Sequence, residues 1–154
     1  MQRGKAAQSD KWGDALTPGF QILPDLVLKA QGTLGLSCVE VIVLENVLMN
    51  WWVRDALSFP TARTISRRMG TSERTVRRSL KRLVNKRILK KVCRGELDSG
   101  DPTRKKLPPG TRFLYDPSPL VRRLCAMAPH DDAYKKRAKE NSDQLQRNID
   151  TTAP

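Results

Sequence analysis

The sequence predicts a mainly α-helical domain that carries one small β-hairpin. Apolar residues recur at helical spacing in several segments between residues 20 and 85, and Gly or Pro residues separate these segments. After residue 87, two short segments rich in apolar, β-branched and aromatic residues are typical of strands. A further helical segment follows the second strand. This order of elements therefore indicates a helical body with a hairpin near its C-terminal end.

Three regions of different composition are expected along the chain. Residues 1–19 are polar, small and charged, and we interpret them as a flexible N-terminal arm. A basic arm that enters a minor groove is the alternative, but Asp10 and Asp14 offset much of its positive charge. The folded domain is expected over residues 20–127. Charge dominates residues 128–154, which we interpret as a polar C-terminal tail, either a frayed helix or disordered.

Two helices are expected before the most basic part of the chain. The first is short and covers residues 20–31. The second starts at Ser37 and runs to about residue 54, because Ser37 and Glu40 have the spacing of a capping box. Apolar residues cover more than one stripe of this helix, so segment 38–53 should be buried on two sides. One side can pack on the basic part of the chain and the other on the first helix or on a second protomer.

Two further helices should meet at a tight glycine turn. The first covers residues 62–69 and ends at Gly70, a residue type that readily adopts the left-handed conformation. The second covers residues 72–86, with Ser72 as its N-cap. Its apolar face consists of Val76, Leu80, Leu83 and Val84. Two helices in this arrangement form a helix-turn-helix motif.

The remaining elements are a hairpin and one more helix. Strands are expected over residues 88–93 and 111–115, joined by a long loop rich in Gly, Pro and Asp. Ser118 is the expected N-cap of a small C-terminal helix, with Pro119 at its first helical position. That helix should end near Pro129.

The run of residues 65–83 resembles the winged helix-turn-helix of bacterial transcription regulators, with a GntR-like spacing of small, Gly, Ser and apolar positions. The resemblance implies that the hairpin is a wing, and that the domain is a winged helix-turn-helix with an extra N-terminal helix and a C-terminal helix. Residues 115–120 are also similar to winged-helix modules of phages, plasmids and integrative elements, including replication initiators. Thr71 stands where the family usually has Val, and Arg87 stands where a Gly usually ends the recognition helix.

Positive charge is concentrated in this central part of the chain. Residues 63–112 contain seventeen Lys or Arg and four acidic residues, a balance of +13 that equals the formal net charge of the whole protein. Six cations of the recognition helix stand against Glu73 alone: Arg74, Arg77, Arg78, Lys81, Arg82 and Lys86. Because unrelieved repulsion destabilises the free protein, we infer a polyanionic partner, namely double-stranded DNA.

The spacing of these residues assigns them two roles. A helix in the major groove exposes its N-terminal residues to base edges, while its flanks and the wing reach phosphates. The predicted base-reading residues are Ser72, Glu73, Arg74 and Arg77. The predicted phosphate-binding residues are Arg63, Arg67, Arg68, Thr75, Arg78, Lys81, Arg94, Arg104, Lys105 and Lys106. Glu73 has a second interpretation, in which it only stabilises the positive end of the helix dipole.

We therefore predict a sequence-specific double-stranded DNA-binding protein, foremost a transcriptional regulator. The alternative is a replication-initiation or maintenance protein of a plasmid, phage or integrative element. An RNA-binding module ranks third, because single-stranded RNA recognition needs exposed aromatic residues and most aromatics here are expected in the core. A cytoplasmic homodimer is expected, with segment 38–53 as the candidate interface. The sequence predicts no membrane segment, cofactor or small-molecule ligand.

The sequence argues against an enzyme. His130 is the only histidine and lies in the polar tail, so a nucleophile in the core has no histidine base. A phosphate-binding Gly-rich loop and an acidic cluster for metal ions are both missing from the sequence. Cys38, Cys93 and Cys125 lie far apart and form no C-x-x-C pair, which argues against a zinc site or a disulfide framework. We interpret these cysteines as small buried hydrophobes.

Overall fold

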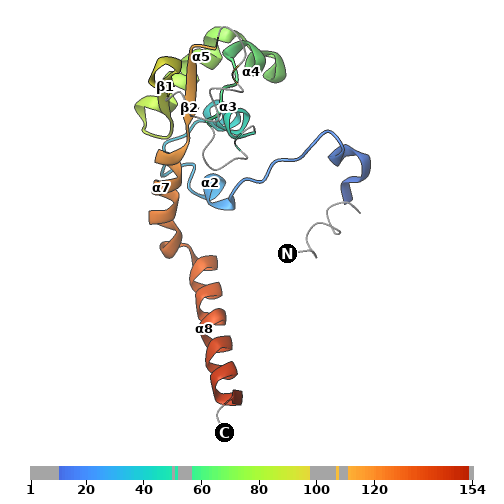
Figure 1. Ribbon diagram of the computed structural model, residues 1–154, viewed down its shortest axis with the longest axis vertical. Helices are drawn as coiled ribbons and strands as arrows, with labels where there is room; N and C mark the ends of the chain where they lie inside the picture. The colour runs from blue at the N-terminus through green and yellow to red at the C-terminus, as the bar shows by residue number, and fades with distance from the viewer. Residues whose placement is uncertain (1–10, 50, 52–56, 98–106, 108–110, 153–154) are drawn as a thin grey trace.

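The computed structural model describes residues 11–49, 51, 57–97, 107 and 111–152. Within these residues lie six α-helices and one two-stranded antiparallel sheet, so the predicted mainly helical class with a small hairpin is confirmed. The elements are α2 (Asp25–Lys29), α3 (Cys38–Leu48), α4 (Ala62–Met69), α5 (Glu73–Asn85), β1 (Lys90–Cys93), β2 (Phe113–Asp116), α7 (Ser118–Met127) and α8 (Asp132–Thr152). The elements from α2 to α7 pack together, whereas α8 extends away from them (Figure 1).

Helix α3 begins at the predicted capping box. The Ser37 N–H donates to Oε2 of Glu40 at 2.8 Å, and the Glu40 N–H donates to the Ser37 hydroxyl at 3.3 Å. Each side chain therefore satisfies a backbone donor that the helix start would leave unpaired. The helix buries Val43, Leu44 and Val47 against the other helices.

The predicted end of this helix near residue 54 is wrong. Helix α3 ends at Leu48, and Trp51 lies outside it. The Trp51 N–H donates to the Leu48 carbonyl at 2.9 Å, while the Ser58 hydroxyl donates to the Val47 carbonyl. The carbonyl that would accept the next helical hydrogen bond is thus occupied by a side chain from a later segment. Residues 52–54 of the predicted helix lie outside the described residues.

The helix-turn-helix motif has the predicted form. The Thr64 N–H donates to the Thr61 hydroxyl at 3.1 Å and starts α4, which ends at Gly70 with a φ of 61°. Helix α5 starts at its predicted N-cap, where the Thr75 N–H donates to the Ser72 hydroxyl at 3.1 Å. The predicted apolar face is also confirmed, since Val76, Leu80 and Leu83 are buried and Val84 is half-buried.

Arg87 adopts the conformation that the family usually gives to glycine. Its φ is 53°, directly after the Lys86 C-cap of α5. A side chain in this left-handed region is strained relative to glycine. The helix end therefore lies where the resemblance places it, although the residue that occupies this position is not a glycine.

Strands β1 and β2 form the wing expected after the recognition helix. Val92 pairs with Leu114, and Lys91 pairs with Tyr115. Ser58 adds one residue of a third strand, because its N–H and carbonyl exchange hydrogen bonds with Tyr115 at 3.1 and 2.8 Å. Val92 and Leu114 face one side of the hairpin and are buried there in a small core with Leu97 and Leu107. The hairpin is therefore fastened to the helical body through the segment that precedes α4.

The C-terminal helices differ from the prediction in one detail. Ser118 is not the N-cap of α7 but its first residue, because the Asp116 carboxylate accepts from the Ser118 N–H at 2.8 Å and from its hydroxyl. Asp116 thus provides the oxygen that a capping serine would have supplied. Residues 132–152 are helical, which corresponds to the helical alternative predicted for the tail. An ion pair of 3.1 Å between Lys29 and Asp131 joins α2 to the start of this region.

The interpretation of the cysteines as buried is wrong. Cys38, Cys93 and Cys125 are all free and exposed. Cys38 is the first residue of α3, and Cys93 alternates with the buried Val92 along β1, so both positions point away from the core. No cluster of three metal-ligating side chains occurs in the described residues. Within the same residues, no helix combines the length and apolarity that crossing a bilayer requires.

Candidate nucleic-acid interface

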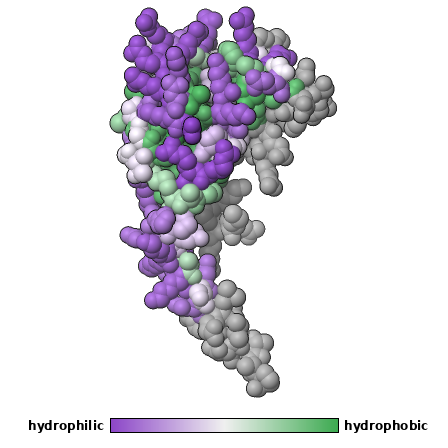
Figure 2. Space-filling view, turned by 90° about the vertical axis from the view of Figure 1, so that its left-hand side faces the viewer, coloured by the Kyte–Doolittle hydropathy of each residue, from purple (hydrophilic) through white to green (hydrophobic). Residues whose placement is uncertain are grey.

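Helix α5 separates apolar and cationic residues on opposite sides. Its buried side consists of Val76, Ser79, Leu80 and Leu83, which pack into the main core. At 100° per residue, Arg74, Arg78 and Lys81 fall on the side opposite to these residues, and all three are exposed. Figure 2 shows hydrophilic side chains gathered at the end of the molecule where α4 and α5 lie. Burial of the apolar side therefore fixes the direction in which the cations project.

The C-terminal end of α5 is anchored by a buried ion pair that the sequence did not indicate. Nζ of Lys86 lies 2.7 Å from Oε2 of Glu40, which is 1% exposed, and it also donates to the Gly35 carbonyl. Nη1 of Arg123 donates to the Lys86 carbonyl at 3.1 Å. Burial raises the pKa of the Glu40 carboxyl, but the hydrogen bonds from Lys86 and Ser37 outweigh this and leave the pKa below its usual value.

Lys86 therefore does not belong to the unpaired charge of the recognition helix, contrary to the prediction. The remaining five cations of α5 include three like-charged pairs at i,i+4 spacing, each of which destabilises an isolated helix. Nη2 of Arg77 lies 2.8 Å from Oε2 of Glu73, and this pair is exposed. An exposed pair of this type contributes little stability. Repulsion along α5 thus remains after the two ion pairs are taken into account.

The predicted base-reading residues lie together in the first two turns of α5. Arg74 is exposed, and Arg77 is exposed while paired with Glu73. The Ser72 hydroxyl accepts the capping hydrogen bond, and its oxygen lies 2.9 Å from the Thr75 hydroxyl. Ser72 and Thr75 are therefore already used in the helix start. The assignment of these residues to bases or phosphates stays a prediction.

The predicted phosphate-binding residues are less closely grouped. Arg63 and Arg67 are exposed on α4, and Arg78 and Lys81 are exposed on α5. Arg68 instead turns towards α3, where Nη1 lies 3.5 Å from Oδ1 of Asn46 and 3.3 Å from Sδ of Met49. Arg94 is half-buried at the end of β1. Three further predicted residues, Arg104, Lys105 and Lys106, lie outside the described residues.

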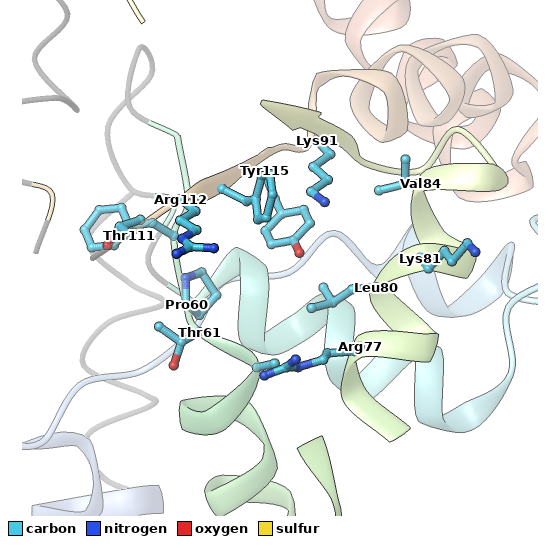
Figure 3. Close-up of a pocket in the computed structure, with 13 residues that line it drawn as sticks. Pro60, Thr61, Arg77, Leu80, Lys81, Val84, Lys91, Thr111, Arg112 and Tyr115 are labelled. Atoms are coloured by element: carbon cyan, nitrogen blue, oxygen red, sulfur yellow. The ribbon is translucent and has the colours of Figure 1, made fainter. Parts of the chain in front are cut away.

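A groove of about 680 Å³ runs between α5, the wing and the start of α4 (Figure 3). Helix α5 contributes Arg77, Leu80, Lys81 and Val84 to its wall. The wing contributes Lys91, Thr111, Arg112, Phe113 and Tyr115, and the segment before α4 contributes Phe59, Pro60, Thr61 and Ala62. The groove therefore joins the cationic helix to an aromatic surface on the wing.

The sequence interpretation missed the wing side of this groove. It expected most aromatic residues in the core, although strand alternation turns every second side chain to the other face. Leu114 is buried beneath the hairpin, whereas Phe113 is 43% exposed and Tyr115 packs only partly against the main core. The alternation of Phe113, Leu114 and Tyr115 was the signal that would have identified the groove-facing residues.

The Tyr115 hydroxyl lies in this groove. Partial burial raises the pKa of its phenol, so the group stays protonated at neutral pH. The hydroxyl points into the groove towards Leu80 (Figure 3), and it has no hydrogen-bond partner among the described residues. Lys91 lies over the Phe113 ring, with Nζ 3.5 Å from the ring centroid. The wing thus presents hydroxyl, aromatic and cationic groups to the same space.

The segment from α2 to β1, with the helix-turn-helix at its centre, carries the likeness to a known family. Residues 23–98 match the DnaD N-terminal domain. The match covers 76 residues, just under half of the chain, and includes α2, α3, α4, α5 and β1. The DnaD N-terminal domain is a winged-helix, non-enzymatic domain of replication initiation. This agrees with the predicted winged fold and with the prediction that the chain is not an enzyme.

The chain also aligns over most of its length with a solved structure. The crystal structure of the N-terminal domain of the DnaD protein from Geobacillus kaustophilus HTA426 aligns with a TM-score of 0.48 and 20% identity. The alignment covers 92% of this chain and 99% of that one. No curated protein matches the chain. The DnaD match supports the predicted resemblance to replication initiators; it shows neither transcription regulation nor origin from a mobile element.

Proposed function

We propose that this chain is a double-stranded DNA-binding protein of replication initiation, with α5 in the major groove and the wing on the adjacent backbone. The observation that carries the proposal is the projection of five Lys or Arg residues from a helix whose other side is fixed in the core. The match to the DnaD N-terminal domain supports a role in replication over control of a promoter. A cytoplasmic location follows from that role.

Within this proposal the cations of α5 have two roles. Arg74 and Arg77 lie in the N-terminal half of the helix, the part that reaches base edges in helix-turn-helix complexes. A bidentate contact from either arginine to guanine is worth about 1–3 kcal/mol of discrimination. Arg78 and Lys81, with Arg63 and Arg67 of α4, bind phosphates in this proposal and orient the protein; their exposure supports this role.

The roles of Arg77 and Lys81 can be separated on a selected duplex site. Arg77→Ala should relax preference at one base pair, whereas Lys81→Ala should weaken all duplex sequences about equally and reduce the salt slope by about one. Competition binding between the site and its single-base variants, repeated at several salt concentrations, measures both effects. If both variants only scaled the affinity, the division into reading and anchoring residues would be wrong.

We further propose that two copies associate through the outer face of α3. Val39, Ile42 and Met49 lie on this face and are 42%, 44% and 41% exposed, although most of the rest of the helix is buried. Their spacing of three and seven residues forms one apolar stripe. Twofold association would place two copies of α5 on two half-sites. Ile42→Glu should then shift a dimer to a monomer in sedimentation at micromolar concentration; a wild-type monomer there would remove the proposal.

A transcription regulator would make the same DNA contacts, but at promoters instead of an origin. Genomic enrichment of DNA bound to the protein separates the two roles, because replication initiation predicts occupancy at an origin. Occupancy confined to promoters would instead favour a regulator and contradict the role in replication.

A further inference from the structure

We propose that the groove between α5 and the wing binds an unpaired nucleotide of the DNA strand that α5 contacts. The inference rests on the proposed DNA-binding function and adds a second form of DNA to it. Duplex DNA offers its bases only as edges in the grooves, whereas an unpaired nucleotide offers the flat face of its base. The walls of this groove fit such a flat, negatively charged unit.

Aromatic side chains form one wall of the groove. Phe59, Phe113 and Tyr115 line the groove from two separate segments, together with the aliphatic side chains of Leu80 and Val84. Phe113 remains 43% exposed even though Lys91 lies over its ring. An aromatic side chain of a strand that is held open to solvent is unfavourable in the free protein. Stacking of a base on such a ring stabilises the complex irrespective of sequence.

Cationic side chains surround this aromatic wall. Four cations line the groove, Arg77 and Lys81 from α5 and Lys91 and Arg112 from the wing. Among the described residues that line the groove, none is acidic. Glu73, the ion-pair partner of Arg77, is not among the residues that line the groove. A phosphate on either side of a stacked base would therefore meet a cation.

The Tyr115 hydroxyl is a polar group within this groove. It points into the groove and has no partner among the described residues (Figure 3). A phenol that stays protonated can both donate and accept a hydrogen bond. A base that stacks on an aromatic ring carries hydrogen-bond donors and acceptors along its edge, beside that ring. Tyr115 thus supplies a polar contact where the surrounding wall is apolar.

An acidic peptide with one apolar anchor has similar chemistry, but the position of the groove favours DNA. Arg77 and Lys81 belong both to the groove and to the cationic surface of α5, so a strand bound on α5 continues directly into the groove. A separate protein partner would compete with duplex DNA for these two side chains. A nucleotide from the same strand uses them without competition.

The test compares two DNA probes with the full chain. One probe is a hexathymidylate that carries one 2-aminopurine, and the other is a blunt 20-base-pair duplex. Phe113→Ala should weaken binding of the hexanucleotide about tenfold or more and abolish quenching of 2-aminopurine, because base stacking is lost. Binding of the duplex should change less than threefold. Tyr115→Phe, which keeps the ring, should weaken the hexanucleotide several-fold and leave the duplex unaffected.

Controls distinguish this inference from the proposed function. Tyr134→Ala removes an aromatic residue of similar exposure from α8 and should change neither probe. If Phe113→Ala left both duplex binding and hexanucleotide binding unchanged, the inference would be overturned and the proposed function would stand. A wild type that binds the hexanucleotide but not the duplex would overturn the proposed function and leave nucleotide binding in the groove standing. A peptide of alternating Glu and Trp that binds in a Phe113-dependent manner, while the hexanucleotide does not, would assign the groove to a protein partner.

Discussion

Helices α5 and α8 carry the same number of cations but use them differently. Each contains five Lys or Arg residues, yet α5 has one acidic residue and α8 has four. Helix α5 buries one side in the core, whereas α8 extends away from the body (Figure 1). Interleaved charges compensate one another along α8, while packing directs the cations of α5 to one surface. The number of cations in a helix is therefore a poor guide to nucleic-acid binding, and their segregation on a packed helix is a better one.

The largest expected effect comes from reversing the charge on the exposed side of α5. Replacement of Arg74, Arg78 and Lys81 by Glu should weaken binding of a 20-base-pair duplex at least a hundredfold at low salt, because three contacts to a polyanion become repulsive. Fluorescence anisotropy at several salt concentrations measures the affinity.

The matched control makes the same change in charge on α8. Replacement of Lys135, Lys136 and Lys139 by Glu alters the net charge by the same amount and should weaken binding less than about tenfold. Equal losses in the two triple variants would show that only total charge matters, and the comparison of the two helices would fail.

A smaller effect concerns two acidic residues: Glu40, which pairs with Lys86 at the end of α5, and Asp132, which pairs with Lys135 in α8. Glu40→Gln should lower the free energy of unfolding by about 2–3 kcal/mol at pH 7, because it leaves Lys86 without its buried counter-ion. Asp132→Asn breaks the exposed 3.6 Å pair with Lys135 and should cost less than about 0.5 kcal/mol. Urea unfolding of both variants measures these differences.

The pH dependence gives the sign of the Glu40 contribution. Because the pKa of Glu40 is lowered on folding, its ionised form stabilises the native state above the usual pKa of 4.5. This stabilisation is lost as the pH falls through the lowered pKa of the folded protein. The wild type and Glu40→Gln should therefore converge in stability in acid, and a constant difference down to the lowest pH at which both fold would contradict the ion-pair explanation.

A further small effect concerns the residue that follows the end of α5. Arg87→Gly should raise the free energy of unfolding by about 0.5–1 kcal/mol, because glycine adopts a φ of 53° without strain. The same substitution at Lys136, within α8, should lower helix stability by about 1 kcal/mol. Thermal unfolding of both variants tests whether the two positions respond with opposite sign.

Sequence reasoning succeeded where the physical cause is local. The capping box at Ser37, the turn at Gly70 and the cap at Ser72 each depend on residues three or four positions apart, and all three were predictable. The apolar face of α5 follows from spacing alone. These local features are sufficient to position the recognition helix.

The errors have causes that lie far apart in the sequence. The end of α3 depends on Ser58, eleven residues after the carbonyl that it contacts, and the charge of Lys86 is compensated by Glu40, 46 residues earlier. The groove depends on the register of β1 against β2, which places Phe113 and Lys91 on the same face. Spacing within one segment carries no information about such partners.

Ser58 links the last turn of α3 to strand β2. Its hydroxyl holds the last turn of α3, which precedes the exposed Met49, while its backbone is bonded on both sides to Tyr115 in the wing. We therefore expect a shift of β2 to be transmitted through Ser58 to the end of α3. If the proposed association of copies and the proposed occupation of the groove both occur, each should alter the affinity for the other reciprocally.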